Sequence, residues 1–353
     1  MARTPHMRPP PFHPARPDLM RPVRVDPAGV EGPTRAQARG PGWRRTSHGF
    51  YVPTSVDRGL VEQRIVEAGH HLTSDMASVT GWASLRWQGA EWFDGGSGGR
   101  VRPVDVAVLH GALRSQPDIA VTSEFMPPRD RHVVDGLRVT VPVCALSFEM
   151  RYAADVRAAA RAFAMAAAAD LVSGEELRSY HELLYHFIGI PQGREGLDLG
   201  EENAWSPREM DMTLVWQLDA RLPRPLLNRP VFDRDGRHVG TPDLLDVTAG
   251  VVGEYDGRLH LAGSRRARDL GREDRFRAVG LEYFTIVSED MPHTARMVTR
   301  MHQARRRALA IPDDRRRWTI TPPPWWVPTH TVALRRALTP AQRERFLGYR
   351  RAG

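Results

Sequence analysis

A run of alternating apolar and polar residues near residue 254 predicts a short β-strand that carries two acids. Val251 and Val252 open the run, Glu254 and Asp256 follow at alternate positions, and Gly257 marks the turn that ends it. Side chains along a strand point to opposite faces in turn, so Glu254 and Asp256 share one face. The pattern therefore predicts two carboxylates side by side on one strand.

A third acid lies on the segment that we expect to pair with this strand. Residues 248–250 are a plausible hairpin turn, and antiparallel pairing through that turn would bring Asp243 beside Glu254. Carboxylates placed in this way repel one another unless a cation lies between them, and their hard oxygen atoms suit Mg²⁺. A divalent ion held there could activate water and position a phosphodiester.

The elements around these strands complete a predicted α/β domain at residues 203–310. Ser206 is a helix N-cap residue, with Pro207 at the first helical position and Glu209 at the third. The remaining predicted elements are a first strand at 226–231, an arginine-rich helix at 265–277, a final strand at 283–287 and a second basic helix at 291–310 that could follow a DNA backbone.

The pattern ahead of this domain predicts a second region of mixed α and β structure. Residues 58–150 combine an amphipathic helix with strand-like runs, residues 151–190 are helical, and the glycine-rich segment 189–202 is the expected boundary. We therefore divide the chain into a disordered basic arm at 1–26, an α+β region at 27–190, the α/β domain at 203–310 and a proline-rich tail with a short helix at 311–353.

The order of acidic and basic residues in the C-terminal domain is similar to that of one nuclease family. Asp243, the run 254–257 (Glu-Tyr-Asp-Gly), His260, and then Arg272 and Arg275 on a basic helix resemble the PD-(D/E)XK nuclease superfamily. The closest likeness is to its very-short-patch-repair-like endonuclease branch, whose pattern is D, a gap, E-x-D-G-x-x-H, a basic helix and a final strand.

This resemblance implies a fold and a set of roles. The fold would be a nuclease-like αβββαβ core of the α/β class. Asp243 and Glu254 would hold Mg²⁺ or Mn²⁺, with Glu209 or Asp256 completing the ligand shell. His260 would assist as an acid or base, since imidazole titrates near neutrality.

Two arginines and one missing lysine belong to the same comparison. Arg272 and Arg275 would neutralise the scissile phosphate; alternatively, they pair with neighbouring acids on a solvated helix face. The superfamily usually carries a lysine two residues after the glutamate. This chain has Asp256 there and contains no lysine, so His260 or an arginine would have to substitute.

The segment at residues 27–56 resembles the front of AbiEi-like antitoxin proteins, in which a winged helix binds DNA. A short helix capped at Thr34 and a β-hairpin at residues 44–52 would be the remnant of that module. Arg44 and Arg45 at the start of the hairpin would then contact nucleic acid. The alternative is a small hairpin that packs on the next domain.

The charge of the chain favours a polyanionic partner. The 353 residues carry a formal net charge of +8, and every basic residue apart from histidine is an arginine. A positive protein attracts DNA, and arginine makes bidentate contacts with phosphate. A GC-rich coding sequence explains the same composition equally well.

Cysteine content and hydropathy argue against a disulfide-linked, cysteine-metal, secreted or membrane-spanning protein. The single cysteine, Cys144, allows neither an intrachain disulfide nor a cysteine metal cluster, which fits a cytoplasmic location. The N-terminus lacks the apolar core of a signal peptide, and the most apolar segment, 158–172, is too short to cross a bilayer. We expect DNA as the partner, with no membrane association and no small-molecule cofactor.

Two functions follow from these patterns. The first is a metal-dependent DNA endonuclease, and the second is a DNA-binding antitoxin or transcriptional regulator that keeps a catalytically decayed nuclease fold. A purely structural protein is the weaker hypothesis, because its acids and His260 would need no common face.

Overall fold

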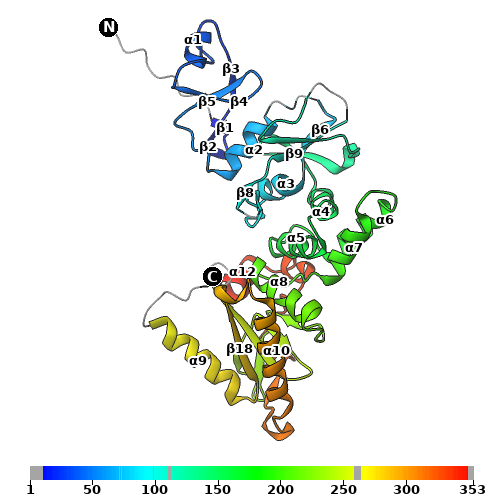
Figure 1. Ribbon diagram of the computed structural model, residues 1–353. Helices are drawn as coiled ribbons and strands as arrows, with labels where there is room; N and C mark the ends of the chain where they lie inside the picture. The colour runs from blue at the N-terminus through cyan, green and yellow to red at the C-terminus, as the bar shows by residue number, and fades with distance from the viewer. Residues whose placement is uncertain are drawn as a thin grey trace. The chain divides into compact units, whose positions relative to one another are not determined.

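The computed structural model describes residues 11–348, apart from residues 71, 73, 98, 110–112 and 258–263. For residues 97 and 264–270 it describes the backbone only. The chain forms two compact units, Met1–Glu149 and Met150–Gly353, and both mix helices with β-sheets (Figure 1). The expected α/β composition is therefore confirmed at this level.

The first unit is built on a five-stranded mixed sheet in the order β10-β9-β6-β12-β11. Val79, Val106 and Val139 lie opposite one another across the three central strands and are fully buried, which explains their β-branched character. The strands are β6 (Ala77–Val79), β9 (Val104–Val108), β10 (Ile119–Thr122), β11 (Arg131–Val134) and β12 (Leu137–Thr140), with the short pair β7 (Gly96–Ser97) and β8 (Arg100–Val101) alongside.

Helices cover this sheet through apolar faces. The helix at residues 61–69 buries Ile65 and Val66 completely. Its last residue, Gly69, lies so close to the sheet that a Cβ atom there would stand 2.6 Å from Val79, so no larger residue fits. The helices are α2 (Val61–Gly69), α3 (Gly81–Trp87), α4 (Pro142–Arg151) and the 3₁₀ turn η1 (Pro128–Asp130).

The predicted disordered arm is corrected by the structure for residues 11–26, which form strands. Phe12, Leu19 and Met20 are buried, and burial of these apolar side chains offsets the entropy of ordering the segment. Gln63 of α2 fixes the strand further, accepting from the Met20 N–H and donating to the Met20 carbonyl. Residues 1–10 lie outside the described residues. The strands are β1 (Pro11–His13), β2 (Arg16–Met20) and β3 (Val23–Arg24).

The hairpin predicted at residues 44–52 is present. β4 (Trp43–Ser47) and β5 (Phe50–Pro53) pair antiparallel, and β3 joins them in a three-stranded sheet. The preceding helix, α1 (Arg35–Ala38), is a single turn, capped by Thr34 in a capping box.

The second unit begins with helices that the sequence placed elsewhere. The glycine-rich segment expected to be a linker forms the helix at residues 190–199, and its glycines are packing positions. A Cβ at Gly196 would lie 2.7 Å from that of Ala159, so only glycine lets the two helices approach this closely. The division between units therefore falls at Glu149, ahead of α5 (Val156–Ala168), α6 (Gly174–Leu183), α7 (Ile190–Leu199), α8 (Pro207–Leu214) and the π-helical turn η2 (Val215–Asp219).

A four-stranded sheet in the order β13-β16-β17-β18 follows these helices. The first three strands pair antiparallel, and the last pairs parallel to β17 after a crossover through a helix. From α8 onward the main elements run helix, three strands, helix, strand. They are β13 (Leu226–Leu227), β16 (Leu244–Asp246), β17 (Val251–Asp256), α9 (Ser264–Ala278) and β18 (Glu282–Val287).

The core of this sheet lies between its strands and α9. Leu245, Val252, Phe276 and Leu281 are buried together in one apolar cluster. In Figure 1, α9 lies on one side of the strands and α10 (Thr294–Leu309) on the other. The 3₁₀ turn η3 (Ser288–Asp290) links β18 to α10.

The proline-rich tail packs against the second unit. A small separate sheet runs β15-β14-β19, in which tail residue Thr319 pairs with Phe232, and the ring of Trp326 stands 5.3 Å from that of Phe232. None of the described helices is long and apolar enough to cross a membrane. The elements are β14 (Val231–Asp233), β15 (His238–Gly240), the 3₁₀ turn η4 (Asp313–Arg315), β19 (Trp318–Thr319), α11 (Val332–Arg336) and α12 (Pro340–Leu347).

Candidate active site

The structure brings Asp243 and Glu254 together on neighbouring strands. Leu244 pairs with Gly253 across β16 and β17, so continuing this antiparallel register by one residue places Asp243 opposite Glu254. The backbone N–H of Tyr255 donates to Asp243 Oδ2 at 2.8 Å, which holds the carboxylate against β17. The side chain of Glu254 is only 14% exposed.

Glu209 joins these two acids from α8. Ser206 caps that helix, and its hydroxyl donates to Glu209 Oε1 at 2.9 Å. The Trp205 N–H donates to Oε2 at 2.9 Å, and Asn228 Nδ2 donates to the same oxygen at 2.7 Å. Glu209 is buried, and burial together with the charge of Asp243 raises its pKa.

Burial and mutual repulsion also act on the two strand acids. Burial raises the pKa of Glu254 well above its usual range, and the nearby charge of Asp243 raises it further. Burial likewise raises the pKa of Asp243, against the opposing effects of the Tyr255 N–H and Arg272. The three carboxyl groups therefore form one electrostatic cluster that resists full ionisation.

Arg272 of α9 provides the counter-charge. Its Nη2 lies 2.8 Å from Glu254 Oε1, and it also donates to the Thr241 carbonyl at 2.5 Å. The charges of Glu254 and Asp243 raise the pKa of Arg272 against the effect of its burial. With all three carboxyl groups ionised, one guanidinium leaves two negative charges uncompensated.

Asn228 is a site residue that sequence reasoning missed. It is 3% exposed and adopts a left-handed backbone conformation with φ of 47°. Its Nδ2 donates to Glu209 and to the Asn203 carbonyl, whereas its Oδ1 has no hydrogen-bond partner among the described residues. An asparagine before Arg-Pro signals a turn at most, so nothing in the sequence pointed to this contact.

β18 adds two further polar side chains. Thr285 lies opposite Glu254 in the parallel register, and Tyr283 lies two residues earlier on the same face. Burial and the charge of Glu254 raise the pKa of the Tyr283 hydroxyl. The acids are therefore flanked by hydroxyl groups on the side away from Asn228.

The other predicted acid–base residues occupy different settings. Asp256 ends β17, half-buried and on the same strand face as Glu254. His260 lies outside the described residues. Arg275 is exposed on α9, and its Nε donates to the Val239 carbonyl at 3.3 Å.

The two arginines predicted to contact nucleic acid in the first unit differ from one another. Arg45 is exposed and interacts with Ser47 and His48. Arg44 forms a two-pronged ion pair with Glu67, with both N–O distances 2.7 Å and each side chain 12% exposed. Its terminal nitrogens are thus engaged inside the protein, and we correct Arg44 from a phosphate contact to a packing residue.

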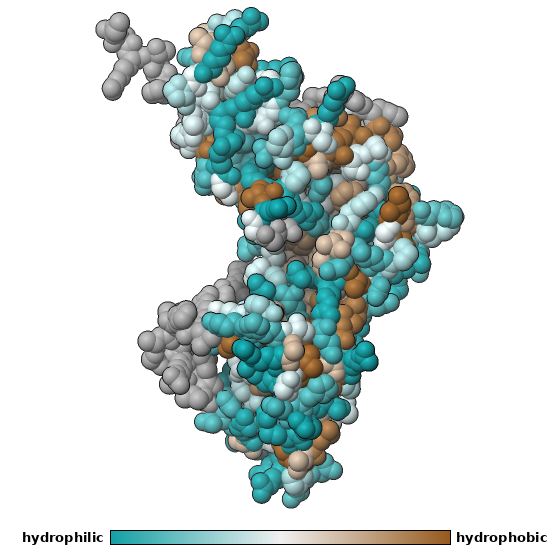
Figure 2. All heavy atoms as spheres, viewed as in Figure 1, coloured by the Kyte–Doolittle hydropathy of each residue, from teal (hydrophilic) through white to brown (hydrophobic). Residues whose placement is uncertain are grey.

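The basic helix expected to follow a DNA backbone is α10, and much of its charge is used internally. Arg300 pairs with Asp290, Arg305 with Asp246, and Arg307 with Glu282. All three acids are buried. These arginines therefore fasten the helix to its own sheet, although the end of the unit where α10 lies still presents a mostly hydrophilic surface (Figure 2).

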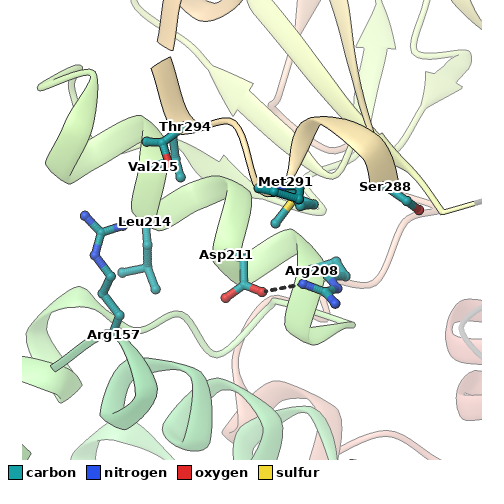
Figure 3. Close-up of a pocket in the computed structure, with 9 residues that line it drawn as sticks. Arg157, Arg208, Asp211, Leu214, Val215, Ser288, Met291 and Thr294 are labelled. Carbon is teal, nitrogen blue, oxygen red and sulfur yellow. Dashed lines mark hydrogen bonds and ion pairs between the residues drawn. The ribbon is translucent and has the colours of Figure 1, made fainter. Parts of the chain in front are cut away.

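A pocket of about 430 Å³ opens near the acidic cluster, between α8 and the segment after β18. Figure 3 shows Arg208 and Asp211 of α8 facing Met291, with Ser288 at the far end. The Ser288 hydroxyl lies 3.2 Å from the hydroxyl of Tyr255, the residue whose N–H holds Asp243. Arg208 is the residue before Glu209; its side chain is 56% exposed and lies 3.4 Å from Asp211, so its charge is paired within the pocket lining.

In the part of the chain that the structure describes, no group of three or more His, Cys, Asp or Glu side chains has the arrangement of a metal site. The oxygen atoms of the cluster that are candidate cation ligands belong to the carboxylates of Asp243 and Glu254 and to the amide of Asn228. This donor set is all oxygen and suits a hard divalent cation such as Mg²⁺ or Mn²⁺.

No model of a known protein family, no curated protein and no solved structure matches this chain.

Proposed function

We propose that the second unit is a metal-dependent DNA endonuclease that hydrolyses phosphodiester bonds, of the very-short-patch-repair-like PD-(D/E)XK type. The order helix, three antiparallel strands, helix, parallel strand supports this, since it is the αβββαβ order that the sequence resemblance implies. The acids also lie at the strand positions that the resemblance assigns to the metal ligands.

One observation carries the proposal: the half-buried Asp243 and Glu254 lie opposite one another, and with Glu209 also ionised their cluster exceeds the charge of Arg272 by two. Leaving such charges buried and unbalanced is costly, so they must take up protons or a cation. A dication would balance them. When bound, Mg²⁺ or Mn²⁺ supplies a water of lowered pKa and neutralises phosphate charge.

The protein's own residues supply positioning and further positive charge. Arg272 stands beside Glu254 and would take the part of the absent lysine, stabilising negative charge that develops on the phosphate. Its guanidinium stays protonated, so Arg272 acts by charge and hydrogen bonding only. The acid–base role of His260 remains a prediction from the sequence.

DNA is the proposed substrate because the chain has a net positive charge and exposed arginines. The whole chain is positive, and Arg208 and Arg275 are exposed on α8 and α9, the helices that carry Glu209 and Arg272. Guanidinium groups in such positions would contact the phosphates that flank the cleaved bond. A cytoplasmic location would follow from the same function.

The second candidate is a DNA-binding antitoxin or regulator whose nuclease fold has decayed. Two observations favour it. Asp256 stands at the usual lysine position, and Arg272 already donates a hydrogen bond to Glu254 Oε1. A protein of this kind would bind DNA through its arginines in a salt-sensitive manner, without a metal ion.

A plasmid-nicking assay separates the two functions. We expect the wild-type chain to convert supercoiled DNA to the nicked form with Mg²⁺ or Mn²⁺ and not with EDTA, and Glu254→Gln to lose at least about 100-fold of that rate. Glu289→Gln, an exposed acid beyond the end of β18, is the matched control and should cleave normally. Metal-independent binding without nicking by the wild type would instead support the regulator.

A further inference from the structure

We propose that Asn228 supplies the third oxygen ligand of the divalent-ion site through its Oδ1, and that Glu209 orients this amide rather than binding the ion. The inference rests on the proposed metal-dependent function and changes the ligand set that the sequence implies. It names a residue that no sequence motif marks.

The orientation of the Asn228 amide is fixed by its hydrogen bonds. Nδ2 donates to Glu209 Oε2 at 2.7 Å and to the Asn203 carbonyl at 2.8 Å. A flipped amide would place its oxygen against the Asn203 carbonyl, which has no hydrogen atom to donate. The oxygen must therefore point away from both, and there it meets no donor in the described part of the chain.

Burial keeps Oδ1 of Asn228 from solvent and leaves it able to coordinate a cation. Asn228 is 3% exposed, so bulk water does not satisfy Oδ1, and an unsatisfied buried acceptor destabilises the fold. The residue also holds a left-handed backbone conformation, with φ of 47°, which asparagine tolerates better than most residues. A polar side chain kept in such a position needs a compensating interaction, and a bound cation or its water provides one.

The strand register places Asn228 in line with the two carboxylates. Leu227 pairs with Leu244, and the Asn228 N–H donates to the Asp243 carbonyl, so the same register continues by one residue. Asp243 in turn lies opposite Glu254. The backbones of Asn228, just after β13, and Asp243, just before β16, therefore lie side by side next to Glu254 on β17, and the Nδ2 contact with Glu209 ties the Asn228 side chain to the same acidic cluster.

Glu209 is a poor candidate for the third ligand because its oxygens already have partners. Oε2 accepts two hydrogen bonds, from Trp205 and Asn228, and Oε1 accepts one from Ser206. These contacts fix a carboxylate so that it can hold the Asn228 amide. A neutral amide oxygen is a normal ligand for Mg²⁺ and Mn²⁺ and adds no further negative charge to the cluster.

Calorimetric titration with Mn²⁺ tests the ligand set without reference to cleavage. The full-length chain would be compared with Asn228→Ala, with Glu209→Gln, which keeps an oxygen to accept from Asn228, and with Asn203→Ala. The last variant removes a buried amide that donates to the Leu227 and Asn228 carbonyls, and serves as the matched control. Circular dichroism establishes that each variant is folded.

We expect Asn228→Ala to weaken Mn²⁺ binding at least about tenfold and Asn203→Ala to stay within about threefold of wild type, whereas Glu209→Gln, which keeps the acceptor but removes one negative charge from the cluster, should weaken binding less than Asn228→Ala does. Equal losses in Asn228→Ala and Asn203→Ala would overturn the proposal, because they would mean a structural role only. A loss in Glu209→Gln of well over about 100-fold, beyond that of an orienting residue, would overturn it even if Asn228→Ala failed to fold. Failure of the wild type to bind Mn²⁺ would instead refute the metal-dependent function itself.

Discussion

His181 is a buried side chain whose two ring nitrogens lack hydrogen-bond partners in the described part of the chain. It lies on α6 and is 1% exposed. Arg151 and Arg194 lie close by, and their charges disfavour a further positive charge on the imidazole. Burial and these two arginines lower the pKa of His181 to about 4.

This setting predicts an acid-sensitive second unit. The folded pKa of about 4 lies below the unfolded value, so the contribution of neutral His181 is present above about pH 6.5. It is lost as the pH falls towards 4, by at most about 3 kcal/mol. His181→Leu should flatten this acid limb in denaturation measured from pH 7 to pH 4, whereas exposed His293→Gln should leave it unchanged. An unaltered limb in His181→Leu would contradict the assignment.

Single residues also show where sequence reasoning reaches its limit. Asp243 and Glu254 could be placed together from the turn between them, since hairpin register is a local property. Asn228 could not, because its role depends on a left-handed turn and on two distant partners, Asn203 and Glu209. Arg44 was misassigned because a sequence does not show which acid an arginine will meet in the fold.

Among the elements, α10 shows how a basic helix can be structural. Its arginines pair with Asp246, Asp290 and Glu282, and each of these acids is buried beneath it. The pairs hold the helix against β16, β18 and η3. A hydrophobic pattern alone gives this helix a buried stripe and does not show that its charged positions are anchors as well.

The central pair, Arg305 and Asp246, predicts a large cost on truncation. Asp246 is 2% exposed and lies 3.0 Å from Arg305 Nε, so Arg305→Ala leaves a buried charge that keeps the hydrogen bonds from the N–H groups of residues 248 and 249 but loses this counter-ion. We expect a loss of about 2–3 kcal/mol in urea denaturation. Exposed Arg306→Ala should cost less than about 0.5 kcal/mol. Similar losses in both variants would show that the pair contributes nothing specific.

The elements also explain which parts of the fold were foreseeable. The short alternating run 251–256, which opens with two valines, and the capped start of α8 are local signals, and both lie where they were predicted. The segment at 189–202 was misread because glycine is ambiguous. In an isolated sequence it suggests a flexible linker, whereas here Gly196 is required for α7 to pack closely against Ala159 of α5.

At the scale of the whole chain, one acid ties the C-terminal segment to a helix more than 150 residues earlier. Asp170, after α5, lies 2.6 Å from both Arg335 and Arg343. Arg335 is fully buried and also donates to the carbonyls of Ala167 and Thr329. The tail is therefore part of the second unit and contributes to its stability.

Asp170→Asn tests this tie. Asparagine keeps the left-handed conformation of residue 170, with φ of 59°, but leaves the Arg335 charge buried without its counter-ion. We expect a loss of about 3 kcal/mol or more in the second unit, together with faster proteolysis of the tail. Asp135→Asn is the matched control, since its φ is 45° and its partner Arg16 is 31% exposed. It should cost under about 1 kcal/mol, and equal effects would contradict the burial argument.

The contact between Arg272 and Glu254 determines how any reaction at this site responds to alkali. An ammonium group beside a carboxylate gives up its proton as the solution becomes basic, and activity then falls along a descending arm. A guanidinium keeps its proton at every pH at which the protein remains folded. The chain has no lysine, so the positive partner of Glu254 contributes no such arm, and any fall in rate at high pH would have to come from a different group, such as His260 acting as an acid.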